Sequence, residues 1–143
     1  MRNSTRFIAF LLSVLLMSSV CALTSAADYS ICYNNTASAD TSANVSGTGL
    51  LTISNRFTGF PSITTHAVIT TYVEKRFLGL FWIRVDIGQT DNEWVDIIYD
   101  YTYVGGHTFQ LTSTGTYRVT AVFNICGSGG PPDVITCRST VVY

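Results

Sequence analysis

Hydrophobic and polar residues alternate along most of the chain after residue 50, and this period of two is typical of strands with one buried face. The clearest stretch is 81–87, where Phe81, Ile83, Val85 and Ile87 alternate with Trp82, Arg84 and Asp86. No window shows the 3.6-residue stripe of an amphipathic helix. Strands are therefore expected at 50–54, 67–74, 81–87, 95–101, 107–112, 117–126 and 134–143.

The more apolar parity of each strand is expected to face the core, because successive side chains of a strand point to opposite faces. The inward-facing set is then Leu51, Ile53, Ala67, Ile69, Thr71, Val73, Phe81, Ile83, Val85, Ile87, Val95, Ile97, Tyr99 and Tyr101. The opposite parity is expected to face outward and includes Tyr72, Trp82, Arg84 and Trp94.

The loop between 67–74 and 81–87 sets which residues lie opposite one another. A four-residue loop, 77–80, would place Glu74 opposite Ile83 and put a carboxylate among core residues. A five-residue loop, 76–80, places Val73 opposite Ile83 and keeps the apolar residues on one face, so we expect this register. Its outer pairs are Glu74 with Trp82 and Tyr72 with Arg84. The second pair is suited to a cation–π contact. If the strands instead lie in facing sheets, these outer pairs are lost.

The first 27 residues have the pattern of a secretory signal peptide. Arg2 and Arg6 precede an apolar run at 7–20, and Ser25-Ala26-Ala27 supplies small residues before a cut. The run is shorter than the roughly 20 apolar residues that a membrane span needs. We therefore expect cleavage after Ala27, a secreted product and no transmembrane span. Lipidation of Cys21 is the alternative, although Val20 is larger than the residue that usually precedes a lipidated cysteine.

Residues 28–143 would then form one small extracellular domain. Removal of 1–27 leaves six Lys and Arg against nine Asp and Glu, a net charge of −3. A domain with this net charge is not expected to have the clustered basic face of a non-specific nucleic-acid binder. Abundant Thr, Val, Ile and Tyr favour strands. Residues 34–49 are polar and small, and we expect a loop or a weakly ordered edge there. The domain is therefore divided into a polar segment with a short strand, 28–49, and a sandwich at 50–143.

Three cysteines remain in the exported product: Cys32, Cys126 and Cys137. Such a chain forms one disulfide and leaves one thiol, or uses the third cysteine for intermolecular pairing. Cys126 and Cys137 flank an expected turn, whereas Cys32 could tie down the N-terminus. The sequence leaves the connectivity and the oligomeric state open.

The segment 113–119, Ser-Thr-Gly-Thr-Tyr-Arg-Val, resembles the tyrosine corner of immunoglobulin-like domains. Val119 stands where antibody domains have a cysteine, so the antibody-type disulfide between the sheets is absent, as is common in bacterial modules of this kind. The resemblance implies an immunoglobulin-like β-sandwich of about seven antiparallel strands. It also implies that Tyr117 is buried and that its hydroxyl bonds to nearby backbone.

The stretch 72–76, Tyr-Val-Glu-Lys-Arg, and the stretch 79–86, Gly-Leu-Phe-Trp-Ile-Arg-Val-Asp, are similar to small secreted Gram-positive, clostridium-like proteins. The similarity runs from about residue 50 to residue 143. That group has no assigned activity, so the resemblance implies fold and export and leaves function open.

Residues suited to catalysis or metal binding are sparse. A hydrolase needs a nucleophile, a base and an orienting group, and the histidines are His66, on an outward strand face, and His107, in an expected turn. No Cys and His spacing fits zinc, and no cofactor is expected. A hairpin that brought Asp86 opposite Asp96 could bind calcium, although a solvated acidic turn is the simpler interpretation. The chain is therefore expected not to be an enzyme.

Exposed aromatic and apolar residues are the remaining candidates for function. Tyr72, Trp82, Arg84 and Trp94 could bind an extracellular protein or a glycan, because these residue types dominate binding hot spots. Residues 77–81, Phe-Leu-Gly-Leu-Phe, form an unusually apolar turn. We expect it to fold inward and cap the core; exposed, it would be a docking tip. The sequence favours a non-catalytic binding module, and the alternative is an antimicrobial or inhibitor-type effector acting through this loop.

Overall fold

The computed structural model describes residues 33–143, so the expected signal peptide, Cys21 and Cys32 lie outside the described residues. Within this range the chain forms eight strands and one short 3₁₀ segment. These are β1 (Thr36–Val45), β2 (Leu50–Gly59), β3 (Thr64–Phe77), β4 (Phe81–Arg84), η2 (Thr90–Asn92), β5 (Trp94–Ile98), β6 (Thr102–Gln110), β7 (Thr116–Gly127) and β8 (Asp133–Val142). The strands form two antiparallel sheets, which confirms the all-β sandwich.

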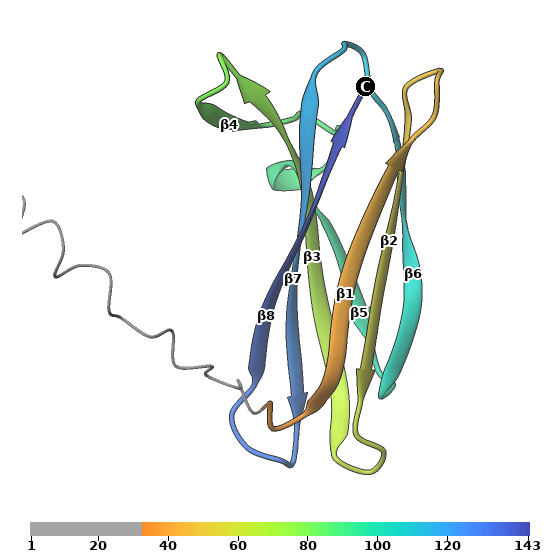
Figure 1. The fold of residues 1–143 in the computed structure, drawn as a ribbon. Coiled ribbons are helices and arrows are strands. Elements are labelled where there is room, and N and C mark those ends of the chain that lie inside the picture. Colours follow the sequence, from red (N-terminus) through yellow and green to blue (C-terminus); the bar gives the residue numbers. More distant parts are fainter. Residues whose placement is uncertain (1–32) are drawn as a thin grey trace, which may run out of the picture. The chain divides into compact units, whose positions relative to one another are not determined.

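The two sheets pack face to face in an immunoglobulin-like order (Figure 1). One sheet has the order β1-β2-β6, and the other has the order β4-β3-β7-β8, with β5 pairing with β3 as well. These orders correspond to strands A, B and E against strands C′, C, F and G of immunoglobulin-like sandwiches. Both inner faces contribute to the core, where Phe57 of β2 packs with Ile69 of β3 and Phe123 of β7.

β3 is the longest strand and passes through the centre of the core. Ala67, Ile69, Thr71 and Val73 are fully buried, as the alternation predicted. β7 pairs with one edge of β3 from Thr64 to Lys75. The other edge of β3 is shared, because β5 pairs with its residues 67–71 and β4 with its residues 74–77.

The polar segment 34–49 contains a ten-residue edge strand, β1, so the loop interpretation is wrong. β1 pairs with β2 along its length. Its start is fixed by Asp133, whose carboxylate accepts hydrogen bonds from the backbone amides of Asn34 at 2.9 Å and Asn35 at 2.7 Å. Burial alone would raise the pKa of Asp133, but these hydrogen bonds outweigh it and hold the pKa below its usual value. β1 therefore belongs to the compact unit Tyr33–Tyr143.

The inward face expected for 95–101 is wrong. Val95, Ile97 and Tyr99 are 53%, 60% and 83% exposed, and the inward-facing residues of β5 are Trp94, Asp96 and Ile98. Both parities of this stretch contain large apolar residues, so hydrophobicity alone does not select a face. Asp96 would argue against this face pointing inward only if its carboxylate were buried without a partner. In the fold the carboxylate has a partner. The strand also ends at Ile98 rather than at residue 101.

The register between β3 and β4 differs by two residues from the expected one. The connecting turn is 78–80, and the pairs are Glu74 with Arg84, Lys75 with Ile83, Arg76 with Trp82 and Phe77 with Phe81. A shift of two residues leaves every side chain on the same face, so the hydrophobic pattern cannot detect it. The expected outer face, with Tyr72, Trp82 and Arg84, is therefore unchanged.

Candidate functional site

The β3–β4 hairpin leans away from the other strands in Figure 1. At its end, Phe77 is 53% exposed, Leu78 and Leu80 are 75% exposed, Phe81 is 61% exposed and Ile83 is 52% exposed. We refer to these five residues as the hairpin tip. The expected inward-folded cap is wrong, because these side chains meet solvent instead of the core. A contiguous exposed apolar cluster of this kind marks an interaction site more often than scattered apolar residues do.

The backbone of the turn makes leucine an unexpected residue at its apex. Leu78 has a φ of 50° and Gly79 a φ of 68°. The backbone amide of Leu80 donates to the carbonyl of Phe77 at 3.1 Å. Left-handed backbone suits Gly, Asn and Asp and costs other residues about 1–2 kcal/mol. An exposed leucine gains no packing that offsets this cost, so folding stability does not account for Leu78.

Guanidinium and aromatic groups stack on the outer face at the root of the hairpin. The Arg84 guanidinium carbon lies 3.7 Å from the centroid of the Tyr72 ring, which confirms the expected cation–π contact. The guanidinium of Arg118, from β7, lies 4.3 Å from the Trp82 ring centroid, and that of Arg76 lies 5.9 Å from it. Both aromatic rings are therefore already engaged by the protein's own arginines.

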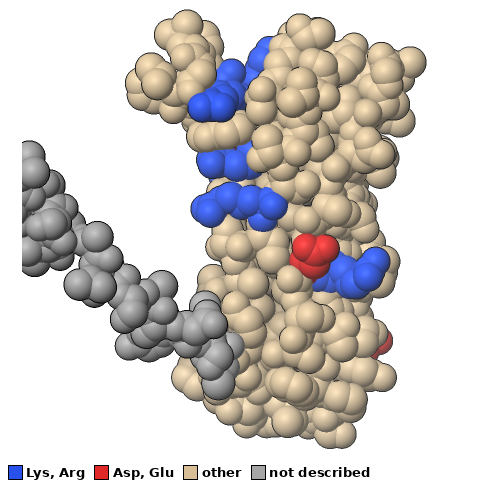
Figure 2. Space-filling view, viewed as in Figure 1, with Lys and Arg blue, Asp and Glu red and all other residues tan. Residues whose placement is uncertain are grey.

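Two ion pairs brace the same surface. Arg84 Nη1 lies 3.1 Å from Glu93 Oε2, next to η2, and Arg118 Nη2 lies 2.8 Å from Glu74 Oε2. Figure 2 shows basic side chains following one another along the side of the molecule near β4 and β8, where few acidic side chains appear. Together with the stacked rings, these pairs hold the root of the hairpin and leave its tip free.

The inner side of the hairpin root is tied to the loop between β6 and β7. Lys75 Nζ lies 2.7 Å from Ser113 Oγ and 5.4 Å from the centroid of the Tyr117 ring. The Tyr117 hydroxyl donates to the Ser113 carbonyl at 2.6 Å, and this buried side chain confirms the expected tyrosine corner. A hollow of about 240 Å³ lies on the hairpin and is lined by Lys75, Arg76, Phe77, Ile83, Arg84 and Val85.

A second cluster joins β5 of one sheet to β6 of the other. His107 Nε2 lies 2.8 Å from Asp96 Oδ2, and the Trp94 ring stacks on the imidazole with 4.8 Å between centroids. Two expectations are thereby corrected: His107 lies within β6 rather than in a turn, and Trp94 packs against the core instead of facing outward. His107 also has a carboxylate partner. Trp94 is therefore not part of an outer aromatic surface.

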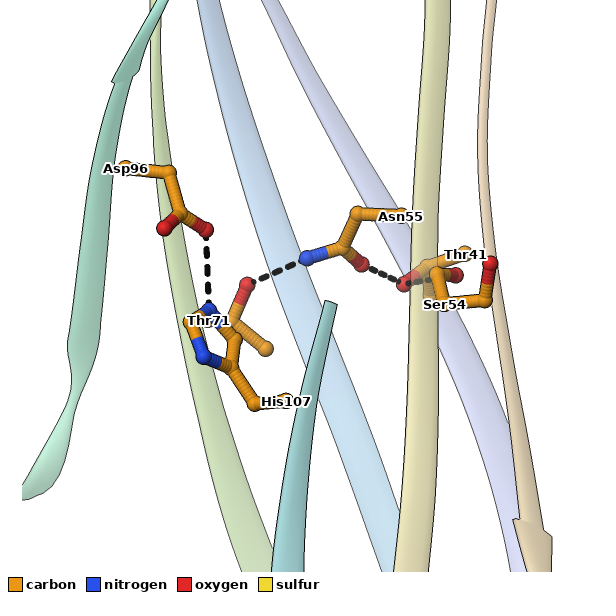
Figure 3. A network of polar contacts seen from close by, with 6 residues as sticks. All are labelled: Thr41, Ser54, Asn55, Thr71, Asp96 and His107. Carbon is orange, nitrogen blue, oxygen red and sulfur yellow. Dashed lines mark hydrogen bonds and ion pairs between the residues drawn. The ribbon is translucent and has the colours of Figure 1, made fainter. Parts of the chain in front are cut away.

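Figure 3 shows this pair beside a separate chain of buried hydrogen bonds. Asn55 Nδ2 donates to Thr71 Oγ1 at 2.8 Å, and Thr41 donates to Asn55 Oδ1. Among residues 33–143, the His107 side chain hydrogen-bonds only to Asp96, so the pair lacks the nucleophile of a hydrolytic triad. Burial, followed by the nearby Asp96 charge, raises the pKa of Tyr103. The cluster therefore ties the two sheets together, and its geometry favours no reaction.

Asp86 and Asp96 do not face each other, so the premise of a calcium site is wrong. β4 and β5 both pair with β3 rather than with each other. The Asp86 carboxylate accepts a hydrogen bond from the Gly88 amide at 2.9 Å, within its own turn. In the part of the chain that the structure describes, no three metal-ligating side chains gather in one place.

Cys126 and Cys137 are free thiols in the described range. Cys126 lies opposite His66 near the end of β7, whereas Cys137 packs against the core with its Sγ 3.5 Å from the Ala39 carbonyl. Burial, followed by the charge of Asp40, raises the pKa of the Cys137 thiol. The turn between β7 and β8 therefore does not bring these two cysteines together, and Cys32 lies outside the described residues. His66, the other histidine, lies 6.2 Å from the Tyr99 ring.

No protein-family model, curated protein or solved structure matches the chain. The resemblance to small secreted Gram-positive proteins, export, and the absence of an enzymatic activity therefore stay predictions. Residues 33–143 contain no helix that is long and apolar enough to cross a membrane.

Three features of the site were missed in the sequence, and two of them have a recognisable signal. Leu78-Gly79 occupies a hairpin turn where Asn-Gly is preferred, so the leucine itself was the anomaly. Arg118 has the outward parity of its strand, between Tyr117 and Val119. The contact between Asp96 and His107 had no local signal, because the two residues lie in different sheets.

Proposed function

We propose that this protein is a secreted, non-catalytic interaction module that contacts its target through the hairpin tip. The observation that supports this function is Leu78, which is 75% exposed and has a φ of 50°. Unfavourable backbone conformation at an exposed position points to a role outside folding. The four other tip residues extend the same apolar surface.

The outer aromatic residues support the tip rather than form the primary contact surface. A ring that binds a glycan by stacking needs a free face, and the rings of Tyr72 and Trp82 already contact guanidinium groups. Their arginines are in turn held by Glu93 and Glu74. This arrangement supports a positioning role for Tyr72, Trp82 and Arg84, which fix the direction in which the hairpin projects.

The braced root also lowers the cost of binding. Side chains and loops that become ordered only on binding lose conformational entropy, and this loss weakens affinity. The hairpin is held on its outer face by Arg84 and Arg118 and on its inner face by Lys75. A target would therefore meet a preformed apolar surface. The effector interpretation uses the same contact element and differs only in the consequence of binding for the target.

The proposal is tested by photocrosslinking from the tip. A benzophenone-bearing residue replaces Leu80 in one protein and Val104 in a matched control. Val104 is 71% exposed, close to the 75% of Leu80, but it lies on the outer face of the other sheet. Both proteins are irradiated on intact bacterial and animal cells. Covalent adducts, to protein or to lipid, are expected from position 80 and not from position 104. Equal adducts from both positions, or none from either, would contradict the proposal.

A further inference from the structure

We infer that the target of the hairpin tip is the surface of a lipid membrane that carries anionic headgroups. This inference rests on the proposed function and adds the partner to it. Its basis is the order of residue types along the hairpin together with the local charge behind the tip.

Residue types change along the hairpin in the order in which a bilayer changes from hydrocarbon to water. Leu78 and Leu80 are at the apex, Phe77 and Phe81 pair next, and Arg76 pairs with Trp82 behind them. Tryptophan concentrates at the membrane interface, and arginine keeps its charged head in the polar layer while its stem lies along apolar surface. An apolar apex followed by tryptophan and arginine therefore matches insertion of the tip into the outer part of a leaflet.

The dimensions of the hairpin also fit shallow insertion. A strand advances about 3.3 Å per residue, which places the Arg76–Trp82 pair about 7–10 Å behind the apex. The apolar face of an interfacial element typically enters a bilayer by about 5–10 Å. With Phe77, Leu78, Leu80 and Phe81 at that depth, Trp82 and Arg76 would reach the headgroups.

Positive charge gathers directly behind the tip. Lys75 and Arg76, which we call the basic collar, lie directly behind the tip, whereas Arg84 in the same stretch is paired with Glu93. Glu74 is already paired with Arg118. In the described range no carboxylate forms an ion pair with Lys75 or Arg76. Arg76 Nε donates to the Gly79 carbonyl at 2.8 Å, and this hydrogen bond holds the Arg76 charge close to the turn. The whole chain has a net charge of −1, so this positive charge is local.

The basic collar favours a lipid surface over an apolar pocket in a protein. A pocket would be filled by the tip alone, whereas a flat anionic surface contacts the apex and everything around it at once. Basic groups near anionic lipid each add to binding, and they act together with inserted apolar side chains. The tip and the collar are therefore two parts of one membrane-contacting surface.

The test uses the chain from Asp28 to Tyr143, which contains the whole compact sandwich and excludes the apolar N-terminal run. Flotation is measured with vesicles of phosphatidylcholine alone and of equal parts phosphatidylcholine and phosphatidylglycerol. The wild-type chain is expected to float with the anionic vesicles, less with the neutral ones, and less as salt increases.

Two variants and one control assign the binding to residues. Leu78→Asp combined with Leu80→Asp should lower the vesicle affinity about ten-fold or more, because the inserted apolar area is lost. Lys75→Gln combined with Arg76→Gln should lower affinity for anionic vesicles by about five-fold per charge and leave neutral binding unchanged. Val104→Asp adds one negative charge, against two in the tip variant, opposite Arg56 on the other sheet and should bind as the wild type does. Circular dichroism and thermal melting verify that each variant is folded.

Each outcome decides the inference. No flotation of the wild-type chain, or equal flotation of the tip variant, overturns it. Equal binding to neutral and anionic vesicles overturns the role of the collar and therefore the anionic partner. Protein adducts from position 80 without vesicle binding overturn the membrane inference and leave the proposed function intact, whereas the absence of adducts overturns both.

Discussion

β4 and β5 pair with the same edge of β3, yet the inward-facing side chains of β5 contact the other sheet, whereas those of β4 are exposed to solvent. In β5, Asp96 and Trp94 face inward and meet His107 of the other sheet. In β4, Ile83 has the inward parity, lies opposite Lys75, and is 52% exposed. The difference is that β6 lies across from β5, whereas the β4 end of the hairpin leans away from the other strands (Figure 1).

This difference shows that parity assigns a side chain to a face without deciding whether it is buried. The residue types are also the reverse of what burial alone would favour. The inward positions of β5 include a carboxylate, while the inward positions of β4, Phe81 and Ile83, are apolar. Asp96 is tolerated because a partner satisfies it. The exposed residues Phe81 and Ile83 have no such structural explanation, which is why we assign them to binding.

The largest expected effect is on Trp94, the tryptophan of the comparison that packs against the core. Trp94→Ala removes the stack on His107 and packing against the core, so it should lower the free energy of unfolding by about 3 kcal/mol. Urea denaturation followed by far-UV circular dichroism measures the change. A loss close to zero would mean that Trp94 is an outer residue after all.

Tyr117→Phe probes the root of the hairpin from the inner side. The change removes the hydrogen bond from the hydroxyl to the Ser113 carbonyl and leaves the ring in place. It should lower the free energy of unfolding by about 1–1.5 kcal/mol, the usual net value of one buried hydrogen bond. An unchanged denaturation midpoint would count against the tyrosine corner.

Trp82→Ala is the counterpart of Trp94→Ala on the β4 side. Only the stacks with Arg118 and Arg76 are lost, so the free energy of unfolding should fall by about 1 kcal/mol, within the range of exposed cation–π contacts. The comparison between β4 and β5 therefore predicts a clearly smaller effect than at Trp94. Equal losses for the two tryptophans, measured in the same urea titration, would remove the distinction.

The sequence was sufficient for the sandwich and for the outward parity of Tyr72, Trp82 and Arg84. In β2 and β3 one parity is mostly polar and the other mostly apolar, so the buried face was unambiguous. In β5 both parities are apolar, and the choice depended on a contact with His107 that no local pattern records. The register expected for β4 was wrong for a related reason. A shift by two residues leaves every side chain on the same face, so the pattern is unchanged.

The exposure of the hairpin tip could not be read from the sequence. Whether Phe77 and Phe81 cap a core depends on whether the hairpin lies over the facing sheet or leans away from it, and no local sequence pattern sets that direction. The expected outward position of Trp94 was wrong because the face expected for its strand was wrong. What remained visible at the sequence level was the unusual turn itself, in which Leu78 precedes Gly79.

The central claim is that Leu78 serves binding rather than folding, and the free energy of unfolding of Leu78→Asn tests it most directly. Asparagine tolerates the left-handed backbone at this position, so the variant should be as stable as the wild type or more stable by up to about 1 kcal/mol. A loss of about 2 kcal/mol or more, as for a leucine in a core, would contradict the claim.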